Sequence, residues 1–268
     1  MQRMLASLPG LVVVTGVTLA ASVATLHAVI SHTLGRQHWL ESPSGLVSTL
    51  AFGGLLALGL LAVLPLAGFL AGACRLLRAH RLLHGLVRGA VPTRVGSREV
   101  WRLSLPGLAC FVAGTVRQRI FVSPVTLNLE PQTREAALLH EEAHLRQRAP
   151  LRRSLLSLFA ATWWFISAAR RLAEHESVRL EVEADDDALR SGAGRRPLFD
   201  AIVQAATLKV PSGAGLATVA VGPRLERLAG TSAAVPKAGG GLITVVVGAA
   251  ALSPVVAHLG VLLSVACF

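Results

Sequence analysis

The stretch "REAALLHEEAHLRQR", residues 134–148, predicts the helix around which the rest of the fold is arranged. We expect this helix to begin near Glu130, with Pro131 in its first turn, and to end before Pro150. Histidines four positions apart lie on one face of a helix, so His140 and His144 present two imidazoles to the same point. The H-E-x-x-H pattern is typical of two zinc ligands with a general base directly after the first of them, which would be Glu141.

A second stretch, "RLEVEADDDAL" at residues 179–189, offers the remaining groups that such a site needs. A catalytic zinc takes a third protein ligand and keeps one open position. Glu181 and Asp185 repeat the spacing of four, so one could bind the metal while the other accepts the N–H of a ligating histidine. Glu183 is an alternative third ligand. Each stretch alone could be a solvated charged face, but together, in a chain with few charges, they favour zinc.

The composition indicates a membrane protein, because 53% of the 268 residues are hydrophobic and only 15% are charged. Three stretches without charged residues exceed the roughly 20 residues that a helix needs to cross a bilayer. They predict two transmembrane helices within residues 1–74, joined by a short external loop, and a C-terminal transmembrane helix at 238–268. A cleaved signal peptide within residues 1–24 is an alternative for the first helix.

Most of the net charge of +11 comes from arginine, and many arginines follow the second apolar stretch. The positive-inside rule therefore places residues 36–44 outside and the chain from Arg75 onward in the cytoplasm, here of a bacterial plasma membrane. We interpret residues 75–102 as a basic linker that contacts anionic lipids of the bilayer. A nucleic-acid partner is the less favoured interpretation of these arginines.

Residues 103–232 are expected to form a cytoplasmic domain that carries the site. Within them, residues 100–127 suggest two or three short strands with a turn near Gly114, and "RIFVS" at 119–123 is the clearest strand. It could be an exposed edge strand beside the metal helix or part of the sheet core. The apolar segment 154–169 has arginine pairs at both ends, so we expect a re-entrant, interfacial or buried helix that does not cross.

Together, "IFVSPVTL", "REAALLHEEAHLRQR" and "RLEVEADDDAL" resemble the membrane-bound zinc peptidases of family M56 and, more distantly, those of family M48, over residues 117–190. The resemblance implies a mainly α-helical integral membrane protein with a gluzincin-like α+β zinc peptidase domain. It implies one catalytic Zn²⁺ held by His140, His144 and Glu181, with Glu141 as the catalytic base and Asp185 as the residue that orients a ligand.

The activity implied by this resemblance is zinc-dependent hydrolysis of peptide bonds in a protein or peptide substrate. One form is regulatory proteolysis, with a transcriptional repressor as substrate or partner, and the alternative is M48-like quality control of membrane proteins. A non-catalytic, zinc-binding signalling subunit is a third interpretation, which the presence of Glu141 disfavours.

Two features depart from the family. The large extracellular ligand-binding domain of its antibiotic-sensing members does not follow the last apolar stretch, so a β-lactam receptor is not expected within this chain. The chain also contains no tyrosine that could stabilise an oxyanion, which leaves His175 or an arginine for that role.

Overall fold

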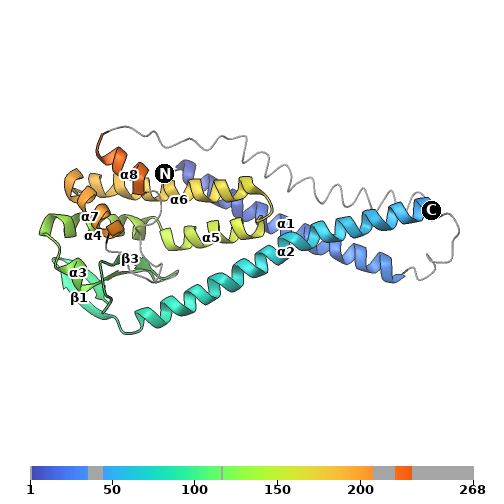
Figure 1. The fold of residues 1–268 in the computed structure, drawn as a ribbon. Helices are drawn as coiled ribbons and strands as arrows, with labels where there is room; N and C mark the ends of the chain where they lie inside the picture. Colours follow the sequence, from blue (N-terminus) through green and yellow to red (C-terminus); the bar gives the residue numbers. More distant parts are fainter. Residues whose placement is uncertain (1, 36–44, 116, 208–220, 231–268) are drawn as a thin grey trace. The chain divides into compact units, whose positions relative to one another are not determined.

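The computed structural model describes residues 2–35, 45–115, 117–207 and 221–230, which are mostly helical and include one small mixed β-sheet (Figure 1). The predicted external loop at 36–44 and the predicted C-terminal span at 238–268 lie outside the described residues. The chain divides into two compact units. The first contains the described residues up to Arg75 and residues 157–173, and the second contains the described residues of 76–156 and of 174–230.

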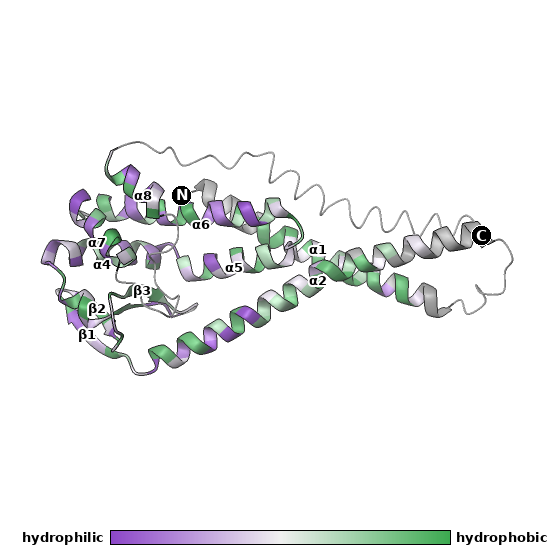
Figure 2. Ribbon diagram, in the orientation of Figure 1, coloured by the Kyte–Doolittle hydropathy of each residue, from purple (hydrophilic) through white to green (hydrophobic). Residues whose placement is uncertain are grey.

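Two long helices, α1 (Gln2–Gly35) and α2 (Gly45–Val87), contain segments long and apolar enough to cross a membrane. These segments are Gly10–Ser31 and Ala62–Val87, and their apolar character is visible in Figure 2. By length and composition they are in keeping with the two predicted spans. Helix α2 does not end where its uncharged stretch ends at Cys74, because it continues through the basic residues to Val87.

The prediction of a basic linker at 75–102 was wrong. Its first part extends α2, and its second part is a hairpin of strands β1 (Val91–Val95) and β2 (Arg98–Arg102) that belongs to the sheet. The segment contains a buried apolar residue and an arginine with acidic partners elsewhere in the chain, and its basic composition gives no sign of either. Val100 is fully buried, and Arg98 lies 2.7 Å from a carboxylate oxygen of both Glu135 and Glu142 on the metal helix.

The sheet has the strand order β1-β2-β4-β3, with β3 at Cys110–Ala113 and β4 at Arg119–Val122. Strand β4 runs parallel to β2 and antiparallel to β3, so "RIFVS" is an interior strand and not an exposed edge. Residues 120–122 are all buried, which a strand achieves when it has neighbours on both sides as well as on both faces. The edge beside the metal helix is formed by β3 instead.

The two faces of the sheet pack against different helices because inward and outward side chains alternate along each strand. One face packs against Leu138 of helix α4 (Pro131–Arg146); its buried residues are Val100, Cys110, Ile120 and Val122. The other face packs against Leu83 and Val87 at the end of α2; it includes Leu103, Phe111, Ala113 and Phe121. Helix α4 therefore lies on the opposite face of the sheet from the end of α2.

Helix α4 matches the predicted metal helix closely. A single-turn helix α3 (Pro124–Leu127) precedes it, and the Glu130 carboxylate accepts the backbone N–H of Thr133 as an N-cap. On its side away from the sheet, α4 packs with α6 (Ser167–Arg190), α7 (Arg195–Thr207) and α8 (Val221–Leu228). The cluster contains Ala136, Leu139, Ala188, Leu198 and Ile202, and it fixes these helices around the polar site.

The prediction of a single apolar helix at 154–169 was wrong. Helix α5 (Ala149–Thr162) ends within this segment, a turn follows at Trp163–Phe165, and α6 begins at Ser167. The segment is thus the tip of a helical hairpin. The hairpin returns the chain, so that His140 and His144 before it and Glu181 after it lie together. That the segment does not cross a membrane stays a prediction.

The hairpin tip packs against two glycines one turn apart on α2. A Cβ atom placed on Gly68 would collide with the backbone oxygen of Ala161, and one placed on Gly72 would lie 2.6 Å from the Ala161 Cβ. Small residues spaced by four let two helices approach closely in an apolar medium. Gly68 and Gly72 therefore form the contact by which the hairpin tip reaches the apolar part of α2.

We predict that Gly68→Ala and Gly72→Ala destabilise the protein, because the added methyl group overpacks this contact at a cost of about 1–3 kcal/mol. Gly85→Ala on the same helix is the control, since nothing lies within 4 Å of its added Cβ and alanine is the better helix former. Thermal unfolding of detergent-solubilised protein measures the difference. Equal midpoints for all three variants would contradict the close contact.

Candidate metal site

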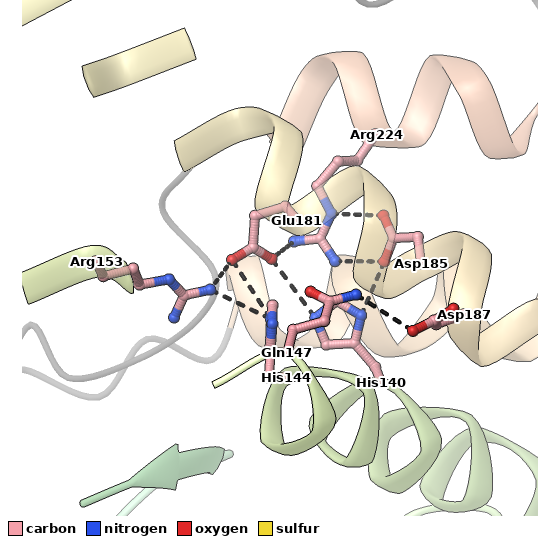
Figure 3. Close-up of polar contacts among 8 residues, drawn as sticks. All are labelled: His140, His144, Gln147, Arg153, Glu181, Asp185, Asp187 and Arg224. Carbon is pink, nitrogen blue, oxygen red and sulfur yellow. Dashed lines mark hydrogen bonds and ion pairs between the residues drawn. The ribbon is translucent and has the colours of Figure 1, made fainter. Parts of the chain in front are cut away.

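His140, His144 and Glu181 converge on one point between α4 and α6 (Figure 3). One ligand atom from each lies within 4.8 Å of the others, and all three residues are buried, with 5%, 1% and 1% of their surface exposed. The two histidines stack edge to face at a ring-centroid distance of 4.5 Å. This group could hold a metal ion.

Each oxygen of Glu181 faces one histidine. Glu181 Oε2 lies 3.5 Å from His140 Nε2, and Glu181 Oε1 lies 3.5 Å from His144 Nε2. These separations are too long for good hydrogen bonds. His140 Nε2 is buried and has no hydrogen-bond partner among the described residues. A buried polar atom without a partner is costly, so its orientation toward Glu181 fits a group of metal ligands.

Asp185 lies one helical turn after Glu181 and contacts the far side of the first histidine. His140 Nδ1 is 2.9 Å from Asp185 Oδ1, which favours a proton on Nδ1 and leaves the Nε2 lone pair directed toward Glu181. Burial alone would lower the pKa of His140, but Asp185 and Glu181 raise it to about 9. Glu181 raises the pKa of His144 as well, but burial and the neighbouring His140 outweigh it and lower that pKa to about 4.

Glu141 is buried beside this group, with 2% of its surface exposed. Burial raises the pKa of its carboxyl to about 8, although the charge of His140 and a hydrogen bond from the Val112 backbone act in the opposite direction. One of its oxygens, Oε2, has no hydrogen-bond partner within the described part of the chain. Glu141 is therefore a sequestered carboxyl group whose protonation changes near neutral pH.

Arg224 on α8 is a site residue that the sequence did not reveal. Its guanidinium lies 2.8 Å from both oxygens of Asp185 and 2.8 Å from Glu181 Oε2, and only 3% of the side chain is exposed. Burial raises the pKa of the Glu181 carboxyl, but the two histidines and Arg224 outweigh it and hold the pKa well below the usual value. The segment "GPRLERL" forms most of helix α8, which brings this cation to the acidic pair.

Arg153 on α5 is the second residue that was missed. Its guanidinium forms an ion pair with Glu181 Oε1 and approaches His144 Nε2 to 3.2 Å (Figure 3). The side chain is 37% exposed, so it covers the site from the solvent side, whereas Arg224 is enclosed. No feature of the sequence separates these two arginines from the many others.

The remaining candidates take other roles. Glu183, the alternative third ligand, pairs with Arg179 at 3.1 Å on its own helix. Glu142, which follows Glu141 in "HEEAH", pairs with Arg98 of the sheet. His175 is half-buried on α6 and does not belong to the group of possible metal ligands within the described residues. The sequence-predicted residues that meet at the site are thus His140, Glu141, His144, Glu181 and Asp185.

Comparison of the chain with protein-family models, curated proteins and solved structures gives no significant match.

We predict that Arg224→Ala is strongly destabilising, because it leaves two buried carboxylates without their cation at a cost of about 3–5 kcal/mol. Arg227→Ala is the matched control, since Arg227 lies on the same helix and pairs with Asp186 where both side chains are well exposed. Its loss should cost less than about 1 kcal/mol. Chemical denaturation of the two variants measures the contrast, and equal losses would show that Arg224 is not a buried counter-ion.

Proposed function

We propose that the protein is a membrane-anchored zinc metalloendopeptidase with its site in the cytoplasm, related to the M56 peptidases that its motifs resemble and built on a gluzincin-like domain. The observation that carries the proposal is the convergence of His140, His144 and Glu181 in a buried group beside Glu141. Two imidazole nitrogens and one carboxylate oxygen, with a further carboxyl group adjacent, are the groups that a catalytic zinc site uses.

The types of ligand atom support zinc over calcium or magnesium. Imidazole nitrogen and carboxylate oxygen are both common zinc ligands. Each histidine Nε2 lies 3.5 Å from one of the two Glu181 oxygens. Calcium and magnesium favour all-oxygen ligand sets, which a pair of imidazoles does not provide. Asp185 completes the arrangement by orienting the His140 ring from behind.

Bound zinc would lower the pKa of its water to about 7 and polarise the scissile carbonyl. Glu141 would take the proton of the attacking water and pass it to the leaving amine. Burial raises the pKa of this carboxyl group above that of an exposed glutamate, which makes its carboxylate a stronger base. Its Oε2, which has no hydrogen-bond partner among the described residues, is the atom available for the transfer.

We assign to Arg153 the stabilisation of the oxyanion that forms on the scissile carbonyl, because the chain has no tyrosine for this role. Arg153 reaches the ligand group from the exposed side, where a substrate would enter. Its contacts with Glu181 and His144 lie within the space that an ion would share, so it would have to move outward when the metal is held. From that position its guanidinium could donate to a carbonyl oxygen that becomes negatively charged.

Strand β3 is the element that we assign to substrate binding, in place of the "RIFVS" strand. Its Val112 N–H points away from β4 toward Glu141, so β3 presents backbone groups on the side of the site. A peptide could add there as a further strand, held by backbone hydrogen bonds that require little sequence selectivity. Such a binding mode suits either regulatory cleavage, for example of a transcriptional repressor, or the quality control of membrane proteins.

We predict that the purified protein contains about one zinc per chain and that Glu181→Ala and His144→Ala lose most of it, because three protein ligands are the least that hold a catalytic ion. Glu183→Ala is the matched control and should retain full occupancy, since its carboxylate pairs with Arg179. Elemental analysis measures this. Zinc lost from Glu183→Ala and kept by Glu181→Ala would show that the third ligand is misassigned.

We predict that Glu141→Gln keeps its zinc and loses activity by about 10²–10⁴-fold, the usual contribution of a general base. Glu142→Gln is the adjacent control and should remain active, because Glu142 pairs with Arg98. Cleavage of an unfolded protein such as casein in detergent provides the assay. If wild-type protein with bound zinc cleaves no peptide, the non-catalytic signalling subunit becomes the better interpretation.

A further inference from the structure

A pocket of about 410 Å³ lies on the face of the sheet opposite the metal helix, where the end of α2 crosses the strands. Its volume is that of a small-molecule site. Leu83 and Val87 of α2 form one apolar wall, and Trp101 and Phe121 of the sheet form the other. Because the α4 side of the sheet faces the metal group, this pocket is separate from the site described above.

Within the described part of the chain, the titratable lining of the pocket is entirely basic. It consists of His80, His84, Arg88, Arg117 and Arg119, and no described aspartate or glutamate lines the pocket. The arginines come from different elements, since Arg88 follows α2 whereas Arg117 and Arg119 come from the β3–β4 turn and from β4. Three guanidinium groups directed to one pocket, without acidic partners in its lining, select an anion, and guanidinium is the side-chain group best suited to phosphate.

Two features hold these cations in place. The guanidinium of Arg119 lies 4.0 Å from the centre of the Trp101 ring, a cation–π contact that fixes it at the pocket wall. Gly114 has a positive φ of 104°, and a Cβ atom there would collide with the backbone oxygen of Arg117. Glycine is therefore required for the tight turn that brings Arg117 to the pocket.

The pocket also has a defined position along the apolar helix. The segment of α2 that is long and apolar enough to cross a membrane, Ala62–Val87, ends beside the pocket, because Leu83 and Val87 lie in its last turns and Arg88 follows it directly. The polar headgroup layer of a bilayer begins where the hydrocarbon ends. With α2 inserted in a bilayer, the arginine at the end of this segment therefore lies at the level of lipid phosphates.

We propose that this pocket binds the headgroup of an anionic phospholipid, with the phosphate held by Arg88, Arg117 and Arg119 and the glycerol region against Leu83, Val87 and Phe121. Basic groups and an apolar wall in one cavity match a ligand that is anionic at one end and apolar at the other. The inference rests on insertion of α2 in a membrane and is independent of the proposed peptidase activity. It replaces a diffuse lipid contact along residues 75–102 with one site, which includes two arginines outside that segment.

The experiment is a titration of the detergent-purified full chain with short-chain phosphatidylglycerol, followed by calorimetry. Arg88→Ala combined with Arg117→Ala removes two exposed cations of the pocket. Arg75→Ala combined with Arg78→Ala is the matched control, because it removes the same charge from exposed positions of α2 outside the pocket. We expect at least a tenfold loss of affinity in the pocket variant, less than a twofold loss in the control, and unchanged thermal unfolding in both.

Two further probes identify what is recognised. Short-chain phosphatidylcholine should bind at least tenfold more weakly than phosphatidylglycerol, and inorganic phosphate at equal concentration should not displace the lipid. Equal losses in the two double variants would overturn the proposal in favour of a diffuse basic surface. Full displacement by inorganic phosphate would overturn it in favour of a free-anion site, and displacement by an acidic peptide but not by phosphatidylcholine would indicate a protein partner.

Discussion

Two carboxylates buried one turn apart on α6 impose the main constraint on this protein. Glu181 and Asp185 are 1% and 4% exposed, and carboxylates at such depth are tolerated only where opposite charges and hydrogen-bond donors surround them. The surroundings supply these groups from three other helices: His140 and His144 from α4, Arg153 from α5 and Arg224 from α8. The placement of those helices is therefore tied to the charge of α6. An apolar cluster that includes Leu139, Ala188 and Ile202 packs α4, α6, α7 and α8 together beside these charges.

Much of this arrangement can be predicted from the sequence because it depends on local periodicity. The spacing of four places both histidines on one face of α4 and places Glu181 above Asp185 on α6. The preference for Glu181 over Glu183 has the same origin, since residues two apart point to different sides of a helix. The helix boundaries follow from Pro131 and from the glutamate that caps the first turn.

The features that the sequence did not predict depend on contacts between distant parts of the chain. Arg153 and Arg224 are two of many arginines, and only the tertiary structure distinguishes the ones that face buried acids. The hairpin β1–β2 was mistaken for a linker because its arginines dominate its composition, although Arg98 is neutralised by Glu135 and Glu142. The order of the strands could not be predicted either, because β4 pairs with β2 although β3 lies between them in the sequence. A short apolar strand looks the same from its sequence whether it lies inside a sheet or at its edge.

Consecutive side chains along each strand point to opposite faces of the sheet, and the two faces have different chemical surroundings. Along β4, Ile120 and Val122 face the metal helix, while Phe121 between them faces the basic pocket and the end of α2. A residue on one face cannot shift along the strand without moving its neighbours on the other, because consecutive side chains share one backbone. Strand β3, which we assign to substrate, follows the same pattern, with Val112 toward the metal helix and Phe111 and Ala113 toward the α2 side. The contacts on the α2 side of the sheet would therefore also fix the register of β3 on the side that faces Glu141. These contacts are the apolar end of α2 and the proposed phosphate-binding pocket.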